Sequence, residues 1–301
     1  MNALHPRVKS SLVWSIVFII CMFFSYTTLI LFIPMIPLLI LRLNNNIRSF
    51  LTYYIVSVLL LAFIFSDILS LYISLTVLLP VLVMGRMYHK HEKAFPAIVS
   101  GVIVLIAEVM VGIYILFLSG ISIAQEIEQF FNENMMEALP EQFMGMLSPE
   151  MVSMYASMIA QLIPLFVVLY AVTMITLVHA IAKQILKKIG MPYYELKPVR
   201  EWMLPRSFVL WYFLFYVIYL FSSTDNNQLS YFLLNIMSLA MITFSIQAIS
   251  FFMFIARNKR WAKVIPFLVL CVMLIFPLII MIISLVGLLD TAFPIRKQLK
   301  K

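Results

Sequence analysis

Apolar residues dominate the chain and fall into long runs that short polar segments interrupt. The runs cover residues 12–31, 33–43, 50–66, 68–85, 95–118, 158–182, 207–222, 229–256 and 264–289. A bilayer with a hydrocarbon core of about 30 Å needs about 20 helical residues per crossing, and fewer where neighbouring helices shield the backbone. The pattern predicts an all-α fold: a polytopic membrane helix bundle with eight or nine spans.

Two prolines divide the first apolar region. In "LFIPMIPLLILRLNNNIRS", Pro34 and Pro37 interrupt a helical pattern, because proline lacks a backbone N–H and fixes its φ angle. They are expected to end the first span and begin a short return helix. Asp67 then marks the outer turn between two further short helices, where it either caps a helix or contacts an external ligand. The chain thus makes six crossings before residue 182.

Charge predicts the orientation. Lysine and arginine are concentrated in residues 86–93, 183–206 and 257–263, whereas residues 94–182 contain neither. Since positively charged loops stay on the cytoplasmic side, these three segments are expected inside and residues 119–157 outside.

The last run, 264–289, does not fit this rule as a single span, because the basic tail after it would lie outside. Pro277 can bend the run back. The side of the C-terminus therefore stays open.

The external segment 119–157 has six glutamates and no basic residue. Its apolar positions recur at helical spacing, which is typical of amphipathic helices that lie on a membrane or cap a bundle. "SPEM" predicts a helix start, with Ser148 as cap, Pro149 at the first position and Glu150 in the first turn. This helix is expected to run unbroken into the span that contains Pro164.

Composition narrows the function classes. Hydrophobic residues make up 64% and charged residues 11% of the 301 residues, and the mean hydropathy is +1.05, which is typical of an integral membrane protein. The net charge of +8 comes from residues between apolar runs, which favours the lipid bilayer over nucleic acid as a partner. No phosphate loop, HExxH, GxSxG or CxxC motif is present, so we expect no enzyme, no metal and no cofactor.

Glu108 is the candidate with the clearest chemical meaning, since a carboxyl group at membrane depth is costly. Helical spacing places Ala97, Gly101 and Gly112 on roughly the same face, so this face can approach another helix closely. Glu108 is then either a proton-accepting or substrate-contacting group inside the bundle, or a protonated glutamic acid that hydrogen-bonds two helices together.

A polar stripe follows one face of the run 229–256. Thr243, Gln247 and Ser250 lie at i, i+4 and i+7, with Asn235 further along. Such a stripe either lines a polar cavity that binds substrate or forms interhelical hydrogen bonds. His179, near the cytoplasmic end of its span, is expected to be partly hydrated and to need no functional role.

The cytoplasmic segment 183–206 is basic and ends in an aromatic and proline-containing stretch. Trp202 is expected to lie at the membrane interface, and Arg200 and Arg206 are expected to bind lipid phosphates. Pro205 is expected to set up the first turn of the next helix. The segment is also where a protein partner would dock.

Two motifs resemble the YybS-like family of multi-pass membrane proteins of Gram-positive bacteria. They are "REWMLPRSFVLW", with Trp202, Pro205 and Arg206, and "GLLDTAFPIRKQL", with Gly287, Asp290 and Arg296. The resemblance extends over essentially the whole chain, and it implies a multi-pass protein of a bacterial cytoplasmic membrane, without an assigned function.

The first half also resembles the S components of energy-coupling-factor vitamin transporters. The likeness consists of a first span, a proline-marked short return helix, two more short helices and two long ones. It implies a six-helix unit over residues 1–182, followed by the cytoplasmic loop 183–206 and C-terminal membrane helices over 207–301.

Two functions follow from these patterns. The first is a transport-related or small-solute-binding protein, with Glu108 facing an internal cavity and the external segment acting as a lid. The alternative is a non-enzymatic scaffold or regulator that binds a membrane or cytoplasmic protein through the loop 183–206.

Overall fold

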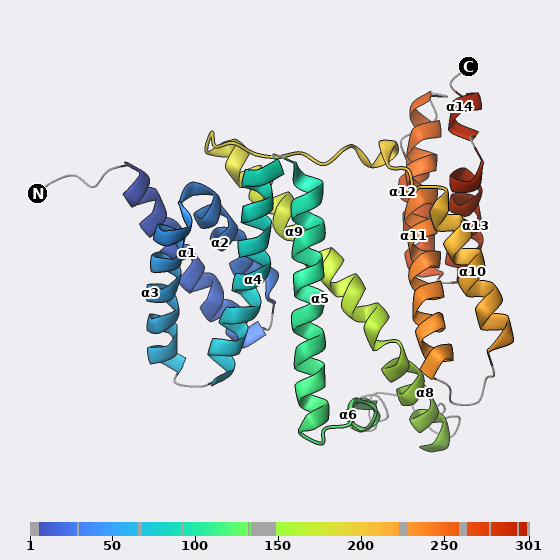
Figure 1. Ribbon diagram of the computed structural model, residues 1–301, viewed down its shortest axis with the longest axis horizontal. Coiled ribbons are helices and arrows are strands. Elements are labelled where there is room, and N and C mark those ends of the chain that lie inside the picture. The colour runs from blue at the N-terminus through green and yellow to red at the C-terminus, as the bar shows by residue number, and fades with distance from the viewer. Residues whose placement is uncertain are drawn as a thin grey trace, which may run out of the picture. The chain divides into compact units, whose positions relative to one another are not determined.

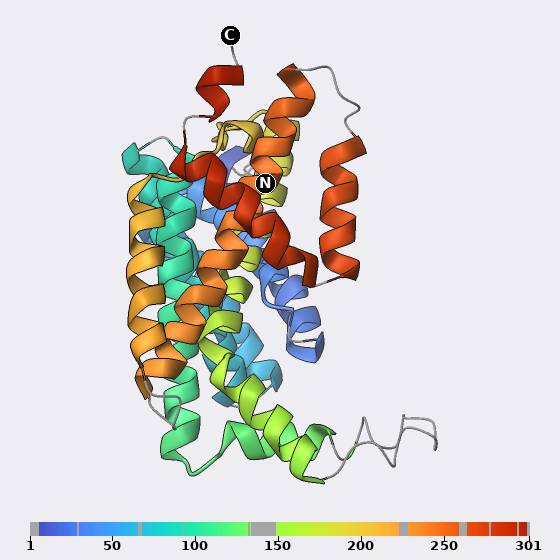
Figure 2. The same cartoon turned by 90° about the vertical axis from the view of Figure 1, so that its right-hand side faces the viewer.

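In the computed structural model, the regular secondary structure of the described residues consists of helices (Figures 1 and 2), which confirms the all-α prediction. The structure describes residues 6–28, 30–65, 68–91, 93–131, 133, 149–222, 228–258, 264–276, 278–293 and 295–299. Asp67, Ser148 and Pro277, which were singled out from the sequence, lie outside these ranges.

The chain forms two compact units, and each unit combines two separate stretches of the sequence. Unit 1 comprises residues 1–122 and 166–196, and unit 2 comprises residues 123–165 and 197–301. The described residues 123–131 and 149–157 of the segment 119–157 therefore belong to unit 2 together with residues 197–301.

Unit 1 contains the helices α1 (Pro6–Thr28), α2 (Phe32–Asn44), α3 (Ile47–Phe65), α4 (Ile68–His91), α5 (Ala94–Leu118) and most of α9 (Ile163–Lys188). A short helix at this place is confirmed: α2 has 13 residues, with Pro34 in its first turn. Pro37 lies inside α2, and the crossing direction of this helix stays a prediction. Residues 34 to 42 of α2 are all buried, so this short helix forms the centre of the unit.

Helices α4 and α5 lie side by side in unit 1 (Figure 1). Gly101 makes the close approach possible, because a Cβ atom there would lie 2.7 Å from the Met84 Cγ atom. Ala97, one turn earlier, is fully buried. The small-residue face predicted for α5 is therefore a packing face.

Unit 2 contains α6 (Ile123–Phe130), α8 (Pro149–Gln161), the 3-10 turn η2 (Val199–Glu201), α10 (Ser207–Phe221), α11 (Gln228–Asn258), α12 (Val264–Ile275), α13 (Leu278–Ala292) and α14 (Ile295–Leu299). Figure 2 shows α13 lying obliquely across α11. The run 264–289 is thus two short helices, α12 and α13, which run in opposite directions (Figure 2).

The expectation of one unbroken helix from Pro149 into the span with Pro164 was wrong. Helix α8 begins at Pro149 as predicted but ends at Gln161, and α9 begins at Ile163 after a turn at Leu162. Pro164 explains the break, because its nitrogen cannot donate to the preceding turn and its ring crowds the carbonyl group four residues back.

Five helices among the described residues are long and apolar enough to cross a membrane: Ile47–Phe65, Ser70–His91, Ala94–Leu118, Ile163–Lys188 and Gln228–Arg257. Five shorter apolar helices accompany them: Ser10–Tyr26, Phe32–Asn44, Ser207–Phe221, Val264–Met273 and Leu278–Ala292. The multi-pass character is clear, and the count of eight or nine crossings stays a prediction.

Candidate functional site

Glu108 lies on α5 of unit 1, one turn after the fully buried Leu105. Both of its carboxylate oxygens are shielded from solvent, and neither has a hydrogen-bond partner within the described part of the chain. An unpartnered carboxyl group can accept hydrogen bonds from a ligand, pair with a cation, or carry a proton.

Two tyrosines belong to the neighbourhood of this part of α5. Tyr54 of α3 is within electrostatic range of Glu108, and its hydroxyl group donates to the carbonyl oxygen of Ser74 over 2.9 Å. The Tyr72 hydroxyl oxygen of α4 lies 2.5 Å from where a Cβ atom at Gly112 would stand, one turn beyond Glu108.

Unit 2 has a buried ion pair near the end of the chain. Asp290 of α13 is fully buried and Arg296 of α14 is 7% exposed. The Arg296 Nη2 atom lies 2.6 Å from Asp290 Oδ2, and its Nε atom lies 3.0 Å from both carboxylate oxygens. The guanidinium group also lies over the rings of Phe251 and Phe254, at 5.8 Å and 5.4 Å from their centroids. Such pairing offsets the cost of burying the two charges.

Two residues of α11 extend this ion pair into a network. Gln247 donates from Nε2 to Asp290 Oδ2 over 2.6 Å, and Ser250 Oγ accepts from Arg296 Nη2 over 3.1 Å. Both side chains are buried, at 3% and 0% exposure. We call Gln247, Ser250, Asp290 and Arg296 the C-terminal polar cluster.

The C-terminal polar cluster binds the backbone of the segment before α10. Arg296 Nη1 donates to the carbonyl oxygen of Arg200 over 2.9 Å, and Ser250 Oγ donates to that of Trp202 over 2.9 Å. The amide of Leu204 donates to Gln247 Oε1 over 3.2 Å. The two sequence motifs, about 90 residues apart, are thus joined by hydrogen bonds.

Gly287 allows this network to form. A Cβ atom at Gly287 would overlap the carbonyl oxygen of Phe244 and would lie 2.9 Å from the amide nitrogen of Ala248. Only a residue without a side chain lets α13 approach the backbone of α11 this closely. Asp290, one turn later on α13, thereby reaches Gln247.

The remaining residues of the first motif have simpler surroundings. Trp202 donates from its indole nitrogen to the carbonyl oxygen of Lys197 over 2.8 Å. The carbonyl oxygen of Pro205 accepts from the amide of Phe208 over 3.0 Å, which starts α10 as the sequence suggested. Arg206 is exposed.

Asn235 and Thr243, the other polar residues of α11 that the sequence singled out, have structural partners. Thr243 donates to the carbonyl oxygen of Leu239 in its own helix. Asn235 donates to the carbonyl oxygen of Gln161 over 2.8 Å and accepts from the amide of Leu165 over 3.0 Å. Asn235 thus joins the two backbone groups that flank the break between α8 and α9.

The predicted substrate-binding residues fall in different units. Glu108 belongs to unit 1, whereas Asn235, Thr243 and Gln247 belong to unit 2. A substrate-binding role for these three stays a prediction. Asp67 lies outside the described residues.

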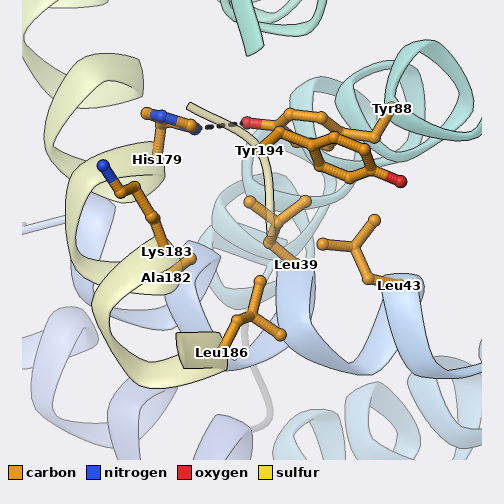
Figure 3. A pocket seen from close by; sticks show the side chains of 8 residues that line it. All are labelled: Leu39, Leu43, Tyr88, His179, Ala182, Lys183, Leu186 and Tyr194. Atoms are coloured by element: carbon orange, nitrogen blue, oxygen red, sulfur yellow. Dashed lines mark hydrogen bonds between the residues drawn. The ribbon is translucent and has the colours of Figure 1, made fainter. Parts of the chain in front are cut away.

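Unit 1 also contains a cluster that the sequence did not predict. The expectation of a partly hydrated His179 was wrong: the residue is 5% exposed, and its Nδ1 atom lies 2.6 Å from the hydroxyl oxygen of Tyr88, which is 2% exposed. The two side chains border a small cavity of about 10 Å³, which has room for about one water molecule. Its lining consists of Leu39, Leu43, Tyr88, His179, Ala182, Lys183, Leu186 and Tyr194 (Figure 3). No spacing links Tyr88 to a residue 91 positions away, so the sequence carried no signal for the pair.

Residues 12–291 match the family described as "Predicted membrane protein (DUF2232)". The chain belongs to this family. It is also 29% identical over 140 residues to the uncharacterized protein YybS of Bacillus subtilis (strain 168), in an alignment that covers 46% of this chain and 45% of that protein. No solved structure matches the chain.

Proposed function

We propose that this protein is a transport-related membrane protein that binds a small solute at Glu108, in the cytoplasmic membrane of a bacterium. One observation carries the proposal: both carboxylate oxygens of Glu108 are shielded from solvent and unpartnered among the described residues. Ionisable groups at membrane depth are costly, and those without a structural partner commonly mark a ligand or ion pathway.

The alternative explanation of Glu108 requires a hydrogen bond between helices. A glutamic acid that ties α5 to a neighbour would place an oxygen within about 3 Å of a donor or acceptor. The described residues offer no such partner. In unit 2, by contrast, the buried carboxylate of Asp290 is bound by two side chains. The difference between these two buried carboxyl groups favours a partner for Glu108 that is not part of the chain, namely a bound solute.

The chemistry around Glu108 suggests the class of solute. A carboxyl group without a partner is complemented by a hydrogen-bond donor or a cation. We therefore expect a small solute with an amine or another donor group. The resemblance of residues 1–182 to the S components of vitamin transporters supports solute binding as an analogy of fold.

The test compares the solutes retained by the purified protein with those retained by Glu108→Gln. The gently solubilised proteins are washed and denatured, and the released small molecules are identified by mass spectrometry. We expect a compound with a donor group that the wild type retains and the variant loses, with an unchanged thermal unfolding temperature. Glu201→Gln, at an exposed position, makes the same chemical change and should retain the compound. Equal retention by both variants would refute the proposal.

A second function, a non-enzymatic scaffold or regulator, is favoured by a separate observation. The C-terminal polar cluster binds the backbone at residues 200, 202 and 204, while the side chains of Trp202 and Met203 stay 36% and 50% exposed. A fixed backbone with exposed aromatic and sulfur-containing side chains is typical of a surface that binds another protein. If the double variant Arg200→Ala, Arg206→Ala loses no co-purified protein that the wild type retains, this second function fails.

A further inference from the structure

The chain after α9 folds back over the cavity of unit 1. Helix α9 ends at Lys188, and Gly190 adopts a φ angle of +72°, which favours glycine. The amide of Met191 donates to the carbonyl oxygen of Leu186 over 2.9 Å, which closes the helix end. Residues 191–196, which we call the strap, have no helical or strand structure. Within the strap, Met191, Tyr194 and Leu196 pack against the core of unit 1.

Two neighbouring residues of the strap contact the cavity lining in different ways. The Tyr194 ring lies parallel to the Tyr88 ring, with centroids 5.0 Å apart and planes 10° apart. The Glu195 Oε1 atom lies 3.3 Å from Lys183 Nζ. The Tyr194 ring and the Lys183 side chain both line the cavity (Figure 3). Glu195 is not part of this lining, but it pairs with Lys183.

The rest of the lining suits a ligand with a flat ring. Leu39, Leu43 and Leu186 supply apolar surface. A hydrogen bond of 2.6 Å joins the Tyr88 hydroxyl oxygen to His179 Nδ1, and it fixes the orientation of the Tyr88 ring. A mostly apolar concave site with a few fixed polar groups is the usual form of a small-molecule site.

We propose that this cavity is the closed form of a site for a planar aromatic anion, in which Tyr194 is the internal substitute for the ligand's ring and Glu195, paired with Lys183, is the substitute for its anionic group. The ligand ring takes the place of Tyr194 on Tyr88, and its anionic group takes the place of Glu195 on Lys183. The ion pair between Glu195 of the strap and Lys183 is solvent-exposed: the Lys183 and Glu195 side chains are 32% and 61% exposed, and such pairs add little stability. Ligand binding must therefore displace mainly the apolar packing of the strap. This proposal does not rest on Glu108.

The test measures binding of indole-3-carboxylate to the full-length protein in nanodiscs by equilibrium dialysis, with empty nanodiscs correcting for partition into lipid. The double variant Tyr194→Ala, Glu195→Gln removes the internal substitute, so its affinity should rise about tenfold or more over the wild type. Adding Lys183→Ala should abolish this gain. For the neutral indole-3-carboxamide, the double variant should show a much smaller rise in affinity over the wild type.

Tyr193→Ala is the matched control, because the Tyr193 ring lies over Lys187 at 5.9 Å and does not line the cavity. Its affinity should equal that of the wild type. Hydrogen exchange of the wild type provides a test that needs no variant: saturating indole-3-carboxylate should accelerate exchange at residues 191–196. The proposal is overturned if the affinity does not rise, if the rise survives Lys183→Ala, or if strap exchange is unchanged at saturation.

Discussion

Arg296 and Asp290 form an ion pair in which three guanidinium N–H···O contacts of 2.6–3.0 Å reach a carboxylate with no solvent exposure. The same guanidinium group donates to the carbonyl oxygen of Arg200. The pair therefore neutralises a buried charge and also attaches the segment before α10 to the C-terminal helices of unit 2.

Removing one member of this pair should destabilise unit 2 strongly. We expect Arg296→Gln to lower the free energy of unfolding by about 3–5 kcal/mol, because Asp290 is left as a buried, unpaired carboxylate. Equilibrium unfolding in mixed micelles with increasing SDS measures the change. Arg257→Gln, at an exposed position in the last turn of α11, is the control and should shift the value by about 0.5 kcal/mol or less. Similar losses in the two variants would contradict this account of the pair.

Gly287→Ala tests the close approach of α13 to α11. The added methyl group would overlap the carbonyl oxygen of Phe244, so the helices must separate, at a cost of about 1–3 kcal/mol. Leu285→Ala on the same helix, where the side chain is 54% exposed, should cost less. The same unfolding titration measures the free energy of unfolding of both variants. If Gly287→Ala leaves this free energy unchanged, the helices do not pack through this glycine.

Gln247→Ala should release the segment before α10 without breaking the ion pair. It removes the acceptor of the Leu204 amide, so hydrogen exchange of a peptide containing Leu204 should become faster. Thr243→Ala, one turn away, is the control, because that hydroxyl group bonds only within its own helix among the described contacts. Unaltered exchange in Gln247→Ala would show that the side chain does not hold the segment.

Asn235→Ala tests the junction between α8 and α9. The variant leaves the carbonyl group of Gln161 and the amide of Leu165 without their shared partner, which should cost about 1–3 kcal/mol. Hydrogen exchange at Leu165 should rise, whereas Asn235→Asp should protect that amide because it keeps an acceptor. Exchange that is equally fast in both variants would contradict a direct bond from Asn235.

The sequence predicted the elements of this fold better than their grouping. The apolar runs predicted nearly every helix, and Pro34 predicted the start of the short helix α2. Both signals depend on residues that are close together in the chain. The break at Leu162 was missed, although Pro164 was visible, because a proline in a first turn and a proline that ends a helix look alike in sequence. The two compact units could not be predicted, since they depend on which apolar faces pack together.

The candidate sites divide in the same way. Glu108 was found because a charge inside an apolar run is conspicuous. The residues of the C-terminal polar cluster were each noted, but their convergence was not, because Gln247 and Asp290 lie 43 positions apart. Tyr88 was missed because a tyrosine near a helix end is common at membrane interfaces.

If a solute binds the carboxyl group of Glu108, as we propose, it should protect this group from a lipid-soluble carbodiimide. Such a reagent modifies carboxyl groups inside the membrane, and peptide mass spectrometry locates the product. We predict that Glu108 is modified in protein stripped of small molecules and is protected after incubation with a concentrated bacterial small-molecule extract. Equal modification of Glu108 with and without the extract would contradict the claim.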